Sequence, residues 1–114
     1  MSRARLKRRA GLKGRALVFA ALGDETRLSI IGKLSSGAPL SISRLTAGSR
    51  MTRQAITKHL RVLESAGVVH SVRAGRESLF EFRLESFKEL QSYLGRVSDQ
   101  WEHALGRLKA LVED

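Results

Sequence analysis

The fold is decided by residues 51–69, which read MTRQAITKHLRVLESAGVV. Within this stretch Ile56, Leu60 and Leu63 recur at spacings of four and three, and this pattern predicts a helix with one buried side. Thr52 is a good N-terminal cap for that helix, and Gly67 is a good C-terminal cap. Burying these three apolar residues turns outward a polar set with three basic members, namely Arg53, Gln54, Thr57, Lys58 and Arg61.

Three shorter helices are predicted before this one. Apolar residues recur at helical spacing over 12–22, which indicates an amphipathic helix entered through Gly14. Asp24 is a good cap for a second helix that carries apolar residues at 28, 30, 31 and 34, and Ser41 can cap a short third helix. A turn at residues 48–50 separates that third helix from the fourth.

After Gly67 the apolar pattern changes from a helical period to a period of two. Residues 68–72 and 78–84 are typical of β-strands, and 73–77 have the length and the glycine of a hairpin tip. A long helix is predicted from about residue 85 to 112. The expected fold is therefore mainly α with a small β-hairpin wing, a winged helix-turn-helix with four helices, two strands and one long helix.

Length and charge set the domain organisation. The chain has 114 residues, which suits one domain, and a formal net charge of +10. We expect residues 1–14 to form a flexible basic N-terminal arm, and residues 15–114 to form the winged domain with its terminal dimerisation helices. A second basic cluster lies at 50–61, whereas 85–114 hold six acidic and four basic residues. This uneven charge indicates one surface for a polyanion and a different surface for another contact.

Several classes of protein are excluded by what the sequence lacks. It has no cysteine, which excludes disulfides, thiolate metal sites and a cysteine nucleophile. No apolar run approaches the roughly 18 residues of a membrane span, and no export signal is recognisable, so a cytoplasmic protein without membrane contact is expected. Nucleophile elbows and phosphate-binding loops are absent, so we predict no enzymatic activity and no cofactor.

The outward side of the fourth helix suits double-stranded DNA. Glutamine can pair with adenine, arginine with guanine, and threonine can contact a base or a thymine methyl group, so base reading is predicted for Arg53, Gln54 and Thr57. Contacts with phosphate or within a groove are predicted for Thr52, Lys58, Arg61, Arg73 and Arg76, the last two at the wing. His59 precedes a core leucine, and either a structural hydrogen bond or a phosphate contact is expected of it.

Three stretches resemble the ArsR/SmtB family of winged-helix repressors. They are FAALGDETR at 19–27, the stretch 51–69 quoted above, and the Gly75-Arg76 wing tip. The match covers roughly residues 16–112 in one register. The resemblance implies a homodimeric repressor that occludes a promoter, with the first and last helices at the dimer interface and the fourth helix on a palindromic operator.

The resemblance also distributes roles among the DNA-facing residues. It implies base reading by Gln54 and Thr57, and backbone or groove contacts by Arg53, Lys58 and Arg76. For Arg53 the side-chain chemistry alone allows base reading as well, so both roles stay open at this point.

The long helix independently suggests a dimer. About 28 residues extend roughly 40 Å, more than a domain of this size covers alone, although the first helix of the same chain is an alternative cover. We therefore predict a dimer interface formed by Leu17, Phe87, Leu90, Leu94, Val97, Trp101, Leu105 and Leu108.

Two further possibilities are weighed here. Asp99 and His103 lie four residues apart on the long helix, where both side chains can be ligands of one metal. Two such residues without a third ligand more often make surface hydrogen bonds, so no metal is predicted. The alternative function is a nonspecific nucleic-acid-binding module for RNA or the nucleoid. RNA readers usually display stacking aromatics, and none lies between Thr52 and Leu79.

Overall fold

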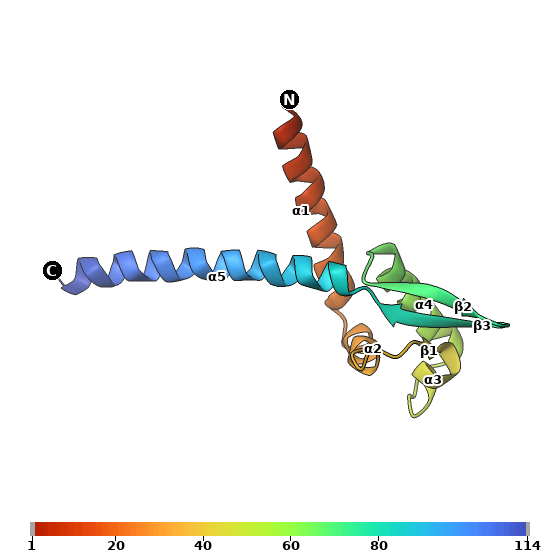
Figure 1. The fold of residues 1–114 in the computed structure, drawn as a ribbon. Helices are drawn as coiled ribbons and strands as arrows, with labels where there is room; N and C mark the ends of the chain where they lie inside the picture. The colour runs from red at the N-terminus through yellow and green to blue at the C-terminus, as the bar shows by residue number, and fades with distance from the viewer. Residues whose placement is uncertain (1, 114) are drawn as a thin grey trace. The chain divides into compact units, whose positions relative to one another are not determined.

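The chain folds into five helices and a three-stranded antiparallel sheet, as seen in a computed structural model that describes residues 2–113 and, for residues 4–10, the backbone alone (Figure 1). This confirms the predicted winged helix-turn-helix fold. The elements are α1 (Arg3–Leu22), α2 (Glu25–Leu34), β1 (Leu40–Ser41), α3 (Ile42–Thr46), α4 (Arg53–Ser65), β2 (Val69–Ala74), β3 (Glu77–Phe82) and α5 (Leu84–Glu113). The chain divides into two compact units, Met1–Leu84 and Glu85–Asp114.

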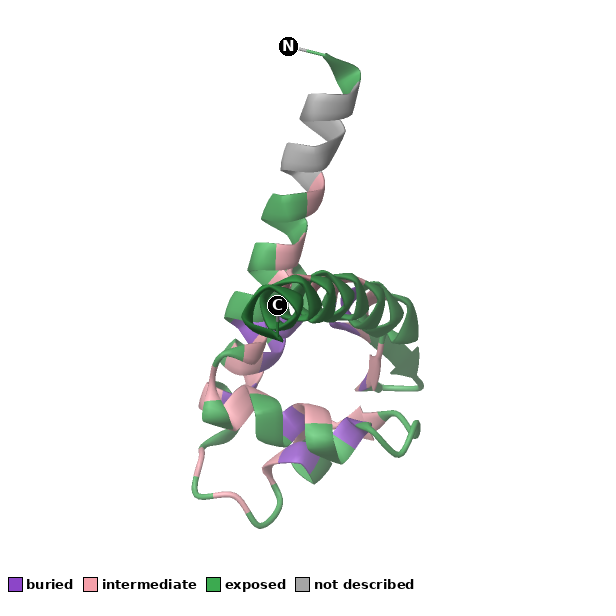
Figure 2. Cartoon of the chain, turned by 90° about the vertical axis from the view of Figure 1, so that its left-hand side faces the viewer, coloured by how far each residue is buried: buried purple, intermediate pink, exposed green. Residues whose placement is uncertain are grey.

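The core of the first unit is aliphatic. Ile56, Leu60 and Leu63, the residues whose spacing predicted α4, are each at most 2% exposed. They belong to one cluster with residues from the other helices and from the sheet, namely Ala21, Ile30, Leu34, Leu45, Val68, Val69 and Phe80. Leu28, predicted on the apolar face of α2, is instead 54% exposed. Buried residues are concentrated in α2, α4 and the strands, while α5 is mostly exposed (Figure 2).

The predicted helix caps are present. The carboxylate of Asp24 accepts the backbone N–H of Arg27, and the Ser41 and Thr52 hydroxyls accept the corresponding N–H groups at the starts of α3 and α4. At the other end of α4, Gly67 has a φ of 79° and its N–H donates to the Glu64 carbonyl, while the next N–H donates to the Leu63 carbonyl. This pair of bonds is a Schellman motif, and it fixes where α4 stops and β2 begins.

The first helix is longer than predicted. It begins at Arg3, and it runs through Gly14 where the sequence predicted its entry. The apolar period was a poor guide here, because residues 3–11 are mostly arginine and lysine, which are good helix formers without an apolar face. The backbone of the basic segment is thus helical; the expectation that this arm is flexible stays a prediction, and the side chains of Arg5, Lys7, Arg8 and Arg9 lie outside those described.

The sheet has the order β1-β3-β2. In the hairpin Ala74 pairs with Glu77, so the loop contains only Gly75 and Arg76 and is tighter than the five-residue tip predicted. Gly75 has a φ of 63°, as the first position of a type II′ turn requires. The two-residue strand β1, which was not predicted, pairs with β3 and so attaches the start of α3 to the wing.

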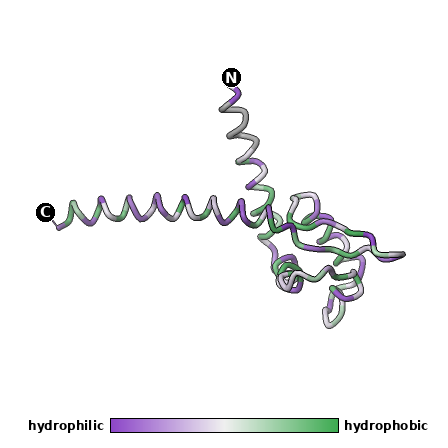
Figure 3. Tube along the Cα trace, viewed as in Figure 1, coloured by the Kyte–Doolittle hydropathy of each residue, from purple (hydrophilic) through white to green (hydrophobic). Residues whose placement is uncertain are grey.

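The second unit consists of α5. Apolar and polar residues alternate along this helix turn by turn (Figure 3), in agreement with the predicted amphipathic pattern. It begins at Leu84, a residue that the alternating pattern had assigned to the strand. None of the described helices combines the length and apolar character that a membrane crossing needs.

Candidate nucleic-acid interface

The side of α4 opposite the core carries the predicted DNA-binding residues. Its exposed side chains are Arg53, Gln54, Lys58 and Arg61, with Thr57 half-buried between them. These five residues, together with Ile42 at the start of α3, line one open hollow of about 470 Å³. The structure therefore brings together all the residues predicted on α4 except Thr52, which caps the same helix.

The hydroxyl groups of Thr52 and Thr57 both make hydrogen bonds with the backbone of α4. The Thr52 hydroxyl accepts the Ala55 N–H at 3.1 Å, and the Thr57 hydroxyl donates to the Arg53 carbonyl at 2.7 Å. This second bond uses the only proton of the Thr57 hydroxyl, so its methyl group and oxygen lone pairs are what it can offer to a ligand. Arg53, Gln54, Lys58 and Arg61, by contrast, have no side-chain hydrogen bond or ion pair with any described residue.

The wing presents two more cations. Arg73 lies on β2 and Arg76 lies in the hairpin turn, and both are exposed. Two polar contacts that the sequence did not predict stabilise this hairpin. His70 Nε2 lies 2.6 Å from Glu81 Oε1 directly across the two strands, and the Ser71 hydroxyl donates to Glu64 Oε2 of α4 at 3.0 Å. The second contact connects the wing to the helix that carries the basic surface.

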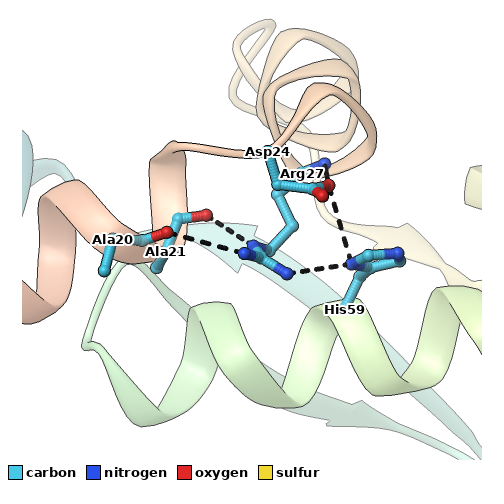
Figure 4. A network of polar contacts seen from close by, with 5 residues as sticks. All are labelled: Ala20, Ala21, Asp24, Arg27 and His59. Carbon is cyan, nitrogen blue, oxygen red and sulfur yellow. Dashed lines mark hydrogen bonds and ion pairs between the residues drawn. The ribbon is translucent and has the colours of Figure 1, made fainter.

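A polar network fixes α4 against the first two helices (Figure 4). The Arg27 guanidinium of α2 donates from Nε to the Ala21 carbonyl at 2.6 Å and lies 3.5 Å from the Ala20 carbonyl. Its Nη1 lies 3.2 Å from His59 Nδ1 on α4. A guanidinium can only donate, so the His59 Nδ1 is the acceptor in this pair. This confirms a structural hydrogen bond for His59. Through Arg27, the GDETR stretch connects α2 with α1 and α4. We call these residues, Asp24, Arg27 and His59, the helix anchor.

Asp24 completes the helix anchor with a charge. The Arg27 backbone N–H bonded to its carboxylate lowers the pKa of Asp24 below its usual value of 3.8, and the positive charge of Arg27 and the nearby His59 act in the same direction. Asp24 Oδ2 lies 3.8 Å from His59 Nδ1. Asp24 is therefore a carboxylate at neutral pH, where it caps α2 and lies close to both Arg27 and His59.

The residues predicted at a dimer interface differ in their solvent exposure. Leu17 on α1 is exposed, and so are most of the apolar residues predicted on α5, with Trp101 at 65%. Leu90 is buried and Val97 is half-buried. Asp99 and His103 are exposed on α5, and among residues 2–113 no group of three potential metal-ligating side chains occurs.

Known helix-turn-helix proteins are similar to this chain in sequence. Residues 22–72 match the family model described as a helix-turn-helix domain. An HTH-type transcriptional regulator of Bacillus subtilis is 43% identical over 79 residues, which cover 64% of this chain and 86% of the relative. An HTH-type transcriptional regulator of Mycobacterium tuberculosis is 30% identical over 95 residues, which cover 83% of this chain and 85% of the relative.

Solved structures are similar over nearly the whole chain. An ArsR-like transcriptional regulator from Rhodococcus sp. RHA1 is 35% identical with a TM-score of 0.80, and the match covers 90% of this chain and 95% of that one. A homodimeric winged helix-turn-helix DNA-binding domain from Mycobacterium bovis is 23% identical, with a TM-score of 0.69, and covers 88% of this chain and 89% of that one. This second likeness shows the shared fold.

Proposed function

The chain belongs to the ArsR family of winged-helix transcription regulators, and we propose that it is a homodimeric repressor that binds a palindromic operator and occludes a promoter. The observation that carries the proposal is the division of α4 into two sides. One side is fixed in the core by Ile56, Leu60 and Leu63, and the other presents Arg53, Gln54 and the cations beyond them. A helix held in this way can enter the major groove as a rigid body.

The roles along α4 follow from reach and chemistry. Gln54 and Thr57 lie in the first half of the helix, and recognition helices contact base edges with their N-terminal residues. An amide such as that of Gln54 can bond adenine at two points, and the Thr57 methyl can contact a thymine methyl. We assign Lys58 and Arg61, further along, to phosphates, while Arg53 at the helix start can reach either a guanine or the backbone.

The wing adds contacts outside the major groove. Arg73 and Arg76 project from a hairpin that a two-residue turn and the Ser71–Glu64 hydrogen bond hold next to α4. A tip of this size and charge fits an adjacent minor groove, where the negative potential attracts arginine. Thr52 caps α4 at the edge of the same surface, where its hydroxyl oxygen and backbone lie nearest a phosphate.

Dimerisation follows from the apolar residues of the terminal helices. Leu17, Phe87, Leu94 and Trp101 are all exposed, and a stripe of this kind along α5 marks a surface that a second copy can cover. We place Val97, Leu105 and Leu108 along the same interface; Leu90, which was predicted there too, is already buried within the single chain. A twofold dimer presents two recognition helices about 34–36 Å apart, one turn of DNA, so its operator is a palindrome. Such a regulator works where the chromosome is, which in bacteria is the cytoplasm.

The test is fluorescence anisotropy with DNA from upstream of the protein's own gene, compared with a shuffled duplex of equal length at about 150 mM salt. We expect a preference of about a thousandfold or more, with two subunits per duplex. Equal affinity for both duplexes, with both lost together as salt rises, would instead indicate a nonspecific nucleic-acid-binding module and contradict the proposal.

Two variants separate base reading from phosphate contact. Gln54→Ala should lose about 1–3 kcal/mol on the operator and relax discrimination at one base pair per half-site. Lys58→Ala should weaken both duplexes alike and make the slope of log affinity against log salt shallower by about 0.9 per subunit. Lys88→Ala, an exposed lysine of α5, is the matched control and should leave both measurements unchanged.

A further inference from the structure

A second open cleft lies in the first unit, between α1 and the C-terminal half of α4. Its volume is about 480 Å³, which falls within the range of small-molecule sites. Ala20, Ser65 and Ala66 face the cleft, and these small side chains explain why two neighbouring helices leave space between them. Leu17 and Val62 form apolar walls, and they are 61% and 42% exposed. An apolar body placed here would remove both from water.

The cleft also contains positive charge. Arg27 and Arg61 both line it, whereas no acidic residue does. The Arg27 guanidinium is held by the Ala21 carbonyl and by His59, as described above. Arg61 is different, because its side chain has no hydrogen bond or ion pair with any described residue. A free guanidinium at the mouth of an apolar cleft can bind a carboxylate through two parallel hydrogen bonds.

Arg61 lines the DNA-facing hollow as well as this cleft. It is one of the residues around the hollow formed by α3 and α4, and it is the residue that the hollow and the cleft share. One guanidinium cannot bind a phosphate on one side and a carboxylate on the other with full strength at the same time. Occupation of the cleft would therefore weaken the contact of α4 with DNA.

We propose that the cleft between α1 and α4 binds a small amphipathic carboxylate, with an unbranched apolar tail between Leu17 and Val62 and its carboxylate on Arg61, and that this ligand opposes DNA binding. The effect on DNA rests on the proposed function, whereas binding itself requires only that a second copy leaves Leu17 accessible in the cleft. The apolar walls and the unpaired cation select this class over a neutral apolar compound or a small inorganic anion, since each of those satisfies only one of the two features.

The direct test is NMR of the uniformly 15N-labelled protein without DNA, titrated with sodium octanoate. We expect saturable shifts of the Ala20, Val62, Ser65 and Ala66 amides. 1-Octanol, which lacks the charge, and acetate, which lacks the tail, should give shifts at least tenfold weaker at equal concentration. Equal responses to octanoate and octanol, or no response of these amides, would overturn the proposal.

Two leucine variants check the location. Ala20→Leu fills the cleft and should abolish the octanoate shifts, whereas Ala16→Leu, at an exposed position of α1 outside the cleft, should retain them. Persistent shifts in the Ala20→Leu protein would place the ligand elsewhere. Sedimentation at each octanoate concentration detects the remaining alternative: if octanoate only converts dimers to monomers, a second copy occupies the cleft and the proposal is wrong.

The effect on DNA is measured separately, by operator anisotropy across a salt series in which the samples with and without octanoate contain the same total sodium at each step. Saturating octanoate should make the slope of log affinity against log salt shallower by about 0.9 per subunit, because one phosphate contact is lost. Arg61→Gln should show that shallower slope without ligand and no further change with it. An unchanged wild-type slope at saturation would overturn the antagonism, and absence of any operator binding would count against the proposed function while leaving the NMR result to stand by itself.

Discussion

Replacement of Arg27 by methionine tests the helix anchor, because methionine keeps the unbranched stem but removes every donor. The variant loses the 2.6 Å bond to the Ala21 carbonyl and the 3.2 Å contact with His59, while the 3.5 Å approach to Ala20 contributes little. A hydrogen bond from a charged group contributes roughly 1.5–3 kcal/mol, and an ordinary one about 1 kcal/mol. Since Arg27 is half-buried and partly screened by water, we expect the free energy of unfolding to fall by about 2 kcal/mol.

The measurement is urea unfolding followed by far-ultraviolet circular dichroism, at equal protein concentration because the proposed dimerisation would shift apparent stability. For a chain of this length the same loss lowers the melting temperature by about 10 °C. Arg44→Met, at an exposed arginine of α3 whose side chain has no partner among the described residues, is the control and should change stability by less than about 0.5 kcal/mol. If the two variants unfold at the same urea concentration, the helix anchor does not stabilise the fold and the reasoning fails.

Three further outcomes are expected. Asp24→Asn keeps a good N-terminal cap but removes the charge. Because the pKa of Asp24 is lowered in the folded state, the charge contributes stability above the pKa of the unfolded state, and this contribution is lost as pH falls through the pKa of the folded state. In urea titrations the wild type should therefore lose more stability than the variant between pH 5 and pH 2. Parallel pH profiles would contradict this. Gly67→Ala places a side chain at positive φ and should lower the free energy of unfolding by about 1 kcal/mol. Gly14→Ala, inside α1 with open space around its Cβ position, should raise it by about 0.5–1 kcal/mol. Thermal melts that shift in the same direction for both variants would refute this explanation of the two glycines. Thr52→Ala removes the α4 cap and should cost about 1 kcal/mol in urea unfolding while Thr52→Ser stays near the wild type, and equal losses in both would show that the hydroxyl is not the cause.

The sequence predicted best those parts of the fold that depend on neighbouring residues. The caps at Asp24, Ser41 and Thr52 each accept a backbone N–H three residues further on, and the apolar period of α4 repeats within four positions even though its residues pack against distant ones. The outward side of α4 followed directly, because fixing three apolar residues in the core determines where the remaining side chains point.

The features that were missed depend on residues far apart in the chain or on the lack of a pattern. The Arg27–His59 contact spans 32 positions, and β1 is recognisable only through its pairing with β3, since two residues cannot show a period. The start of α1 was misplaced because a run of basic residues has no apolar face to reveal its period.

Thr57 and Glu64 on the outward side of α4 are bonded within the protein, but three of their neighbours are not. The side chains of Gln54, Lys58 and Arg61 make no hydrogen bond or ion pair with any described residue, so exchanging them changes stability by no more than the small amount usual for surface positions. Stability and sequence preference can therefore vary independently in descendants of this gene. Under the proposed function, single substitutions at these three positions change which DNA is bound, while the core side of the same helix keeps the fold.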